Sequence, residues 1–166
     1  AQYVSTIAND GDRMKLHLVK EIRGANPNGD ELGKLIKRIE PEVLNRLNAS
    51  QDHIKRVQQG FYRVTHGSSG TASSYYKGLN VAGKTGTAEV GRKGSGMENL
   101  LFVGYAPYND PEIAFSVVVP NIRKNAGSGI THRIGQDIVK AYNELQEKPY
   151  TLNNHDQKDS SKSEDE

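Results

Sequence analysis

Residues 78–89 have the sequence GLNVAGKTGTAE, and this stretch decides how the rest of the chain is interpreted. Leu79 and Val81 alternate with other residues, as apolar side chains do along a β-strand. The period of two along a strand sends Thr85 and Thr87 to the same side. Two hydroxyl groups on one side of a strand can bind one carboxylate together. The stretch is therefore predicted to be a strand that carries a binding site.

The same stretch also matches a second chemical pattern. Residues 78–85 satisfy G-x-x-x-x-G-K-[ST], in which Lys84 would reach nucleotide phosphates and Thr85 would hold magnesium. That phosphate-binding loop works only between a buried strand and the N-terminus of a helix. Here it follows the polar residues 73–77 and leads into a glycine-rich segment, so neither flank is suitable. A nucleotide-binding loop is kept as the less favoured alternative.

The N-terminal part of the chain predicts a strand, a turn and a short helix. Apolar residues alternate over 14–18 as in a half-buried strand, which leads to a tight turn at residues 28–29. Apolar residues over 32–39 keep the i, i+3, i+4, i+7 spacing of a helix, and Pro41 would end that helix.

A longer helix is predicted over residues 51–65. Ser50 can cap its N-terminus, and Gly67 supplies a stop after its last turn. Its apolar face would consist of Ile54, Val57, Phe61 and Val64. Such a face needs another element to cover it.

The C-terminal half predicts three strands and a helix. The strands are expected over residues 79–90, 101–106 and 113–119, and their closeness in sequence suggests an antiparallel meander. An amphipathic helix over residues 131–147 is expected to lie across this sheet. Its predicted apolar side is made of Ile134, Ile138, Tyr142 and Leu145.

These elements predict an α+β fold, with an antiparallel sheet flanked by helices. Residues 1–148 would form the folded part, and residues 149–166 would form a disordered acidic tail. The net charge of +2, with Lys and Arg spread along the chain, argues against nucleic acid as a partner. The five His residues show no ligand-like pairing, so neither a metal nor another cofactor is predicted.

From Lys84 onward the stretch begins K-T-G-T-A-E, and it resembles the K-T-G box of penicillin-binding proteins and serine β-lactamases. Residues 60–64 (GFYRV) and 70–72 (GTA) before the box, and residues 103–107 (VGYAP) and 113–120 after it, are similar to class B penicillin-binding proteins. The likeness is to the 2B type of Gram-positive bacteria in particular. It covers residues 1–148, which it identifies as the C-terminal part of a transpeptidase domain.

The resemblance implies a serine-type D,D-transpeptidase that cross-links peptidoglycan stem peptides through an acyl-enzyme and is the target of β-lactams. Within the box, it implies that Lys84 adds positive charge and that the N–H of Thr87 belongs to an oxyanion hole. Thr85, Gly86 and Thr87 would bind the substrate, which could lie along the strand as an added strand. Proteins of the same fold that hydrolyse or sense β-lactams are the alternatives.

Two further motifs of the family, a nucleophilic S-x-x-K on a helix and an S-x-N, have no counterpart here. There is no S-x-N, and the one S-x-x-K, Ser74 to Lys77, lies in a Gly- and Ser-rich connection that does not predict a helix. We therefore expect an N-terminal segment of the same protein, present as a second chain, to supply the nucleophile. No apolar run approaches the ~20 residues that cross a bilayer. An anchor outside this chain would hold the protein on the extracytoplasmic face of the cell membrane.

Overall fold

The computed structural model describes residues 1–25, 32–92 and 94–147. The turn predicted at residues 28–29 and the tail predicted over residues 149–166 lie outside the described residues.

Two units make up the chain. The larger one contains residues 1–15 and 42–141, and the smaller one contains residues 16–41 and the residues from Tyr142 onward.

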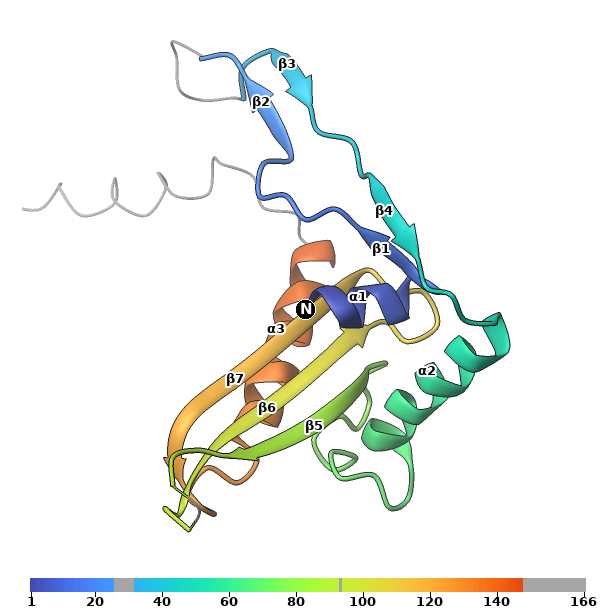
Figure 1. The fold of residues 1–166 in the computed structure, drawn as a ribbon. Coiled ribbons are helices and arrows are strands. Elements are labelled where there is room, and N and C mark those ends of the chain that lie inside the picture. The colour runs from blue at the N-terminus through green and yellow to red at the C-terminus, as the bar shows by residue number, and fades with distance from the viewer. Residues whose placement is uncertain (26–31, 93, 148–166) are drawn as a thin grey trace, which may run out of the picture. The chain divides into compact units, whose positions relative to one another are not determined.

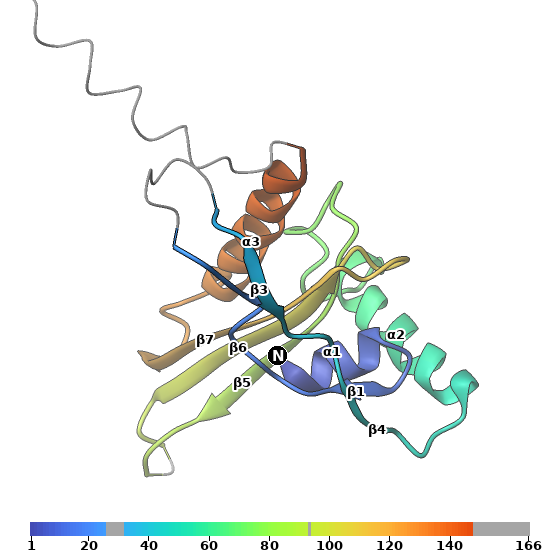
Figure 2. The same cartoon turned by 90° about the horizontal axis from the view of Figure 1, so that it is seen from above.

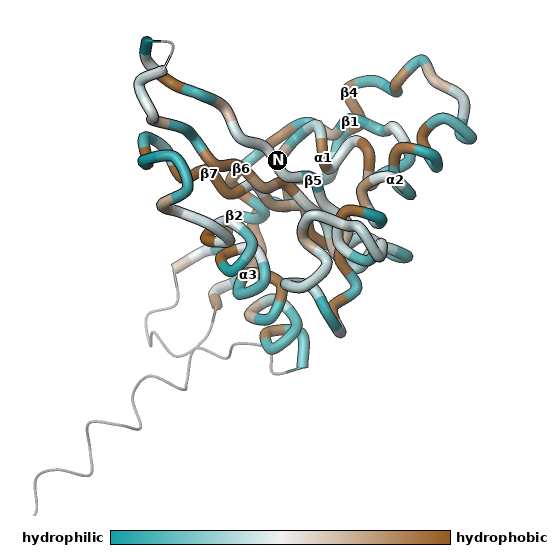
Figure 3. The backbone as a smooth tube through the Cα atoms, turned by 90° about the horizontal axis from the view of Figure 1, so that it is seen from below, coloured by the Kyte–Doolittle hydropathy of each residue, from teal (hydrophilic) through white to brown (hydrophobic). Residues whose placement is uncertain are grey.

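A three-stranded antiparallel sheet is the centre of the larger unit (Figure 1). Its strands are β5 (Ala82–Glu89), β6 (Met97–Ala106) and β7 (Ile113–Arg123), in the order β5-β6-β7. The predicted meander is therefore confirmed, although β6 and β7 are longer than expected. Figure 3 shows apolar residues concentrated along β6 and β7.

The helix α3 (Ile130–Glu147) begins one residue before the predicted helix and covers one face of the sheet (Figure 2). Between them lies a core of buried side chains, among them Tyr76, Phe102, Phe115, Val117 and Val139. The rings of Tyr76 and Phe102 stack with their centroids 5.2 Å apart.

The predicted apolar side of α3 is wrong. Ile134 and Ile138 are 38% and 36% exposed, whereas Thr131, Gly135 and Val139 are buried. The reason is that Gly135, at the centre of the three buried residues, has no side chain. A Cβ atom on Gly135 would collide with the Tyr76 hydroxyl group and would lie 3.1 Å from the Phe115 ring. The helix therefore approaches the aromatic core along its smallest residues.

Two further helices pack against the sheet, one on its other face and one beside β5, where it contacts both cores. They are α1 (Gln2–Ala8) and α2 (Gln51–His66), and Figure 2 shows α1 on the side of the sheet opposite to α3. The buried residues of this second core are Val4, Ala8, Ala82, Val103 and Tyr105. The middle strand β6 thus contributes side chains alternately to both cores, as the pleat of a strand requires.

The residues predicted to cap α2 at its two ends make the expected hydrogen bonds. Ser50 Oγ accepts a hydrogen bond from the N–H of His53 at 3.3 Å, and after the last turn the N–H of Gly67 donates to Arg63 O at 2.8 Å. Its predicted apolar face is only partly covered. Ile54 is 5% exposed, but Val57 is 45% exposed.

A two-stranded ribbon completes the larger unit. It pairs β1 (Asp12–Met14) with β4 (Val43–Arg46) in an antiparallel register that shifts between Arg13 and Met14. Arg46 Nη2 donates to Asp12 Oδ2 at 2.8 Å across the two strands.

The smaller unit contains a second antiparallel pair, β2 (Glu21–Arg23) with β3 (Leu35–Arg38). The helix predicted over residues 32–39 is therefore wrong, because these residues pair with β2 as a strand. The strand predicted over 14–18 is also wrong beyond Met14, since Leu16 and Leu18 lie outside any strand and are exposed.

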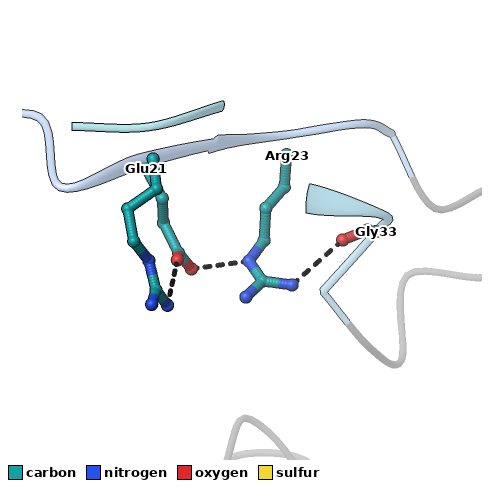
Figure 4. Close-up of polar contacts among 4 residues, drawn as sticks. Glu21, Arg23 and Gly33 are labelled. Carbon is teal, nitrogen blue, oxygen red and sulfur yellow. Dashed lines mark hydrogen bonds and ion pairs between the residues drawn. The ribbon is translucent and has the colours of Figure 1, made fainter. Parts of the chain in front are cut away.

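The carboxylate of Glu21 connects the two strands of this small sheet by hydrogen bonds (Figure 4). Its carboxylate accepts hydrogen bonds from Arg23 Nε at 2.6 Å and from Arg38 Nη2 at 3.4 Å. Arg23 Nη1 also donates to Gly33 O at 3.2 Å. The hydrogen bonds from the two guanidinium groups, with Arg23 the larger cause, lower the pKa of Glu21.

Candidate active site

Strand β5 holds the K-T-G box in its middle. Lys84 is paired with Val103 and Thr85 with Phe102 in the register with β6. Consecutive residues of a strand point to opposite faces of the sheet, so Lys84 and Thr85 lie on opposite faces. Thr87 is paired with Leu100 and is on the same face as Thr85. The two threonines are thus placed where one ligand group could contact both.

Lys84 is exposed, and its position is defined by one hydrogen bond. Its Nζ atom donates to the carbonyl oxygen of Thr85 at 2.7 Å. The ammonium group is therefore held next to the backbone of the box. Among the described residues no other side chain is hydrogen-bonded to this ammonium group, so it could bind an anion without breaking such a contact.

The strand β5 lies at the edge of its sheet. Among the residues that the structure describes, it pairs with β6 alone. The outer backbone groups of an edge strand are free to bind an extended peptide as an additional strand. Within the described part of the chain, the outer edge of the box is therefore not paired with another strand.

The nucleotide-binding alternative is wrong. Lys84 and Thr85 lie within a strand that is paired with β6. After β5 the chain turns back into β6, so no helix follows the pattern. The phosphate-binding loop needs backbone N–H groups that curve around an anion at a helix N-terminus, and this segment has neither feature.

Close contacts restrict which residues can replace the two glycines of the strand, Gly83 more strongly than Gly86. A Cβ atom on Gly83 would overlap the Phe102 ring and lie 2.8 Å from Val103 O. A Cβ atom on Gly86 would lie 3.3 Å from the Leu101 Cβ atom, which is tight but not impossible. Gly86 therefore has a packing role in addition to the predicted role of leaving room for a substrate.

The structure brings one further hydroxyl group to the box. Thr71 Oγ1 lies 3.5 Å from Thr85 Oγ1, although 14 residues separate them. A cavity of about 490 Å³, lined in part by Arg63, Ser68 and Thr71, adjoins this position. The GTA sequence at 70–72 contributed to the family resemblance, but it gave no sign of contact with Thr85.

The S-x-x-K sequence from Ser74 to Lys77 does not form the helical arrangement of a nucleophile and its base. Both residues are exposed and lie in a series of turns. Tyr76, between them, is fully buried in the core against α3. This geometry supports the interpretation of the pattern as a coincidence.

Within the described ranges, no three His, Asp or Glu side chains are grouped so that they could hold a metal ion. Over the same ranges, no helix has both the length and the apolar character needed to cross a bilayer.

Residues 1–140 match the model of the penicillin-binding protein transpeptidase domain. The chain belongs to this family. Penicillin-binding protein 2A of Bacillus subtilis is 43% identical over 160 residues, which cover 89% of this chain and 22% of the Bacillus protein. The peptidoglycan D,D-transpeptidase MrdA of Haemophilus influenzae is 30% identical over 145 residues, covering 78% of this chain and 20% of that protein.

A solved member of the family shares the fold. The structure of penicillin-binding protein 2B from Streptococcus pneumoniae strain R6 superimposes with a TM-score of 0.74 at 38% identity, covering 89% of this chain and 24% of that one. The resemblance to class B penicillin-binding proteins of the 2B type and the α+β fold class are confirmed. The chain spans about a fifth of the length of the curated relatives it matches.

Proposed function

We propose that this chain is the K-T-G-bearing part of a serine D,D-transpeptidase that cross-links peptidoglycan stem peptides. The observation that carries the proposal is the position of the box on an open edge strand within a penicillin-binding transpeptidase domain. A stem peptide offers both an extended backbone for that edge and a carboxylate for the hydroxyl groups of Thr85 and Thr87.

In this reaction a serine oxygen attacks the carbonyl carbon of the penultimate D-Ala. The peptide bond to the terminal D-Ala breaks, that residue leaves as the free amino acid, and an acyl-enzyme ester forms. The amine of a second stem peptide then attacks the ester, so that a new peptide bond forms and the serine hydroxyl is restored. A β-lactam enters the same first step and leaves the ester in place.

The residues of the box have separate roles in this proposal. Lys84 places positive charge next to the backbone of the box, and Thr85 and Thr87, on the other face of the strand, donate hydroxyl hydrogen bonds to the bound carboxylate. The N–H of Thr87 donates to the oxyanion that forms during attack, a contribution of roughly 3 kcal/mol for a single donor. Gly86 lets the substrate backbone approach the strand.

The nucleophile is proposed to come from a part of the protein outside these 166 residues. Neither of the two other family motifs is available in this chain, and the relatives are several times longer. An N-terminal segment, present as a second chain, would supply the serine and an anchor. The anchor would place the protein on the extracytoplasmic face of the membrane, where peptidoglycan is assembled.

Labelling of the complete protein with a fluorescent penicillin tests this proposal. We expect one covalent adduct, on a serine outside this chain, that persists for many minutes. Peptide mapping by mass spectrometry locates the adduct. An adduct on Ser74, or no adduct at all, would overturn the proposal. Loss of the adduct within seconds would instead indicate a β-lactam hydrolase of the same fold.

A further inference from the structure

The last turn of α2 binds the residues that lead into β5. Thr65 is 1% exposed, and its Oγ1 atom lies 2.6 Å from the carbonyl oxygen of Val81 and 2.9 Å from that of Tyr62. A hydroxyl group has one proton to donate, and the shorter contact assigns it to Val81 O. The neighbouring His66 places its Nε2 atom 2.9 Å from the carbonyl oxygen of Leu79. A carbonyl oxygen can only accept a hydrogen bond, so Nε2 carries a proton. Two adjacent side chains of one helix thus hold two carbonyl groups of one short segment.

The residue between these two carbonyl groups is also held. The N–H of Tyr108, which follows β6, lies 3.1 Å from Asn80 O and 3.2 Å from Asn80 Oδ1. Every carbonyl group from Leu79 to Val81 therefore has a donor from another element, with α2 on two of them and the end of β6 on the third.

Aromatic stacking fixes the donors relative to one another. The Tyr62 ring stacks on the His66 ring with centroids 4.2 Å apart and an interplanar angle of 6°. The other stacking partner of Tyr62 is Tyr108, at 4.4 Å. The imidazole of His66 is also 2.9 Å from Thr65 Oγ1 through Nδ1. These contacts leave the His66 ring little freedom to rotate away from Leu79.

We propose that Thr65 and His66 are positioning residues for the K-T-G box. Residues 79–81 run directly into β5, and Lys84 follows Val81 by three residues. The strand β5 is paired with β6 along one side only, so the contacts that hold residues 79–81 are an additional restraint on where the strand begins. By binding Leu79 O and Val81 O, the two side chains set the path of β5, and with it the position of the Thr87 N–H. This role rests on the proposed transpeptidase function.

The test uses the complete protein and separates the acylation rate constant of a penicillin from its dissociation constant before acylation. His66→Phe keeps a ring that can stack on Tyr62 but removes both nitrogens, and Thr65→Val removes the hydroxyl group with little change of shape. We expect each to lower the acylation rate constant by ~10-fold or more, because small displacements of catalytic groups have effects of this size. His66→Gln retains an N–H donor and should recover most of the lost rate.

The matched control is His53→Phe, the same substitution at the exposed first turn of α2, which should acylate at the wild-type rate. Thermal unfolding is measured for every variant. A folded His66→Phe protein with the wild-type acylation rate constant and a lower unfolding temperature would overturn the positioning role, since the contacts would then serve stability alone. If His66→Phe does not fold, Thr65→Val carries the test; failure of both to fold would also overturn the proposal. A wild-type protein that is never acylated would instead overturn the proposed function.

Discussion

Lys84 is the residue of the candidate site whose positive charge is proposed to assist the reaction. Its ammonium group is exposed and bound to the carbonyl oxygen of Thr85. Lys84→Ala in the complete protein should slow acylation by a penicillin by ~10²-fold or more, because in the proposed mechanism the positive charge stabilises charge that develops during attack. Stopped-flow measurement of adduct formation checks this prediction.

Lys77→Ala is the matched control, because Lys77 is also exposed but lies in the turns before β5. This variant should acylate at the wild-type rate. Equal rates for Lys84→Ala and the wild type would reject the assignment of Lys84.

Thr87 offers a test that separates its side chain from its backbone. Thr87→Ala should reduce the acylation rate modestly, since the proposed N–H donor survives the change. Thr87→Pro removes that donor and should cost ~10²-fold or more in rate, as loss of one oxyanion-hole donor does elsewhere. Circular dichroism would show whether the proline variant is folded. Similar rates in the two folded variants would contradict the role of the N–H.

The two glycines of β5 should tolerate substitution differently. Gly83→Ala forces a methyl group against the Phe102 ring and Val103 O, and we expect it to lower the free energy of unfolding by ~1–3 kcal/mol. Gly86→Ala meets only Leu101 at 3.3 Å and should cost less. Urea denaturation of the complete protein measures both. A larger loss for Gly86→Ala would show that the packing around β5 has been misjudged.

At the scale of single elements, local signals predicted α2 and the meander well. The Ser50 cap and the stop at Gly67 are properties of neighbouring residues, so they can be recognised without the fold. The helix predicted over 32–39 failed because its apolar face is not buried: all four residues of β3 are exposed, and backbone pairing with β2 decided the conformation. The side of α3 was misjudged because Gly135 has no apolar side chain to indicate burial.

The ribbon of β1 and β4 should respond to pH through one ion pair. Hydrogen bonding from Arg46 lowers the pKa of Asp12 below its ordinary value of 3.8. A carboxyl group whose pKa is lower when folded stabilises the protein above the unfolded pKa, and this stability is lost as the pH falls through the folded pKa. The wild type should therefore unfold at a higher temperature than Asp12→Asn at pH 7, with the difference shrinking below about pH 4.

Calorimetry at several pH values checks this expectation. Glu40→Gln, which alters an exposed carboxylate outside the ribbon, should show a smaller difference from the wild type. A difference between the wild type and Asp12→Asn that does not change with pH would contradict the role of the pair.

At the scale of the whole molecule, the candidate site could be predicted only where its residues are contiguous. The box from Lys84 to Thr87 is contiguous and carries a family pattern, so the sequence revealed it. The contacts of Thr71 with Thr85 and of His66 with Leu79 join residues 14 and 13 positions apart. No spacing rule connects such residues, because the turns between them decide where they meet.

The strand β6 shares its side chains between two cores, and this arrangement bears on how substitutions far from the K-T-G box in sequence can act on it. Phe102 belongs to the core under α3, and it is paired with Thr85 of the box. A smaller residue there would let β5 shift while every residue of the box stays the same. We expect Phe102→Leu to change the ratio of acylation rates between a bulky and a compact β-lactam. A substitution outside the K-T-G box would then alter the choice between β-lactams while the sequence of the box stays unchanged.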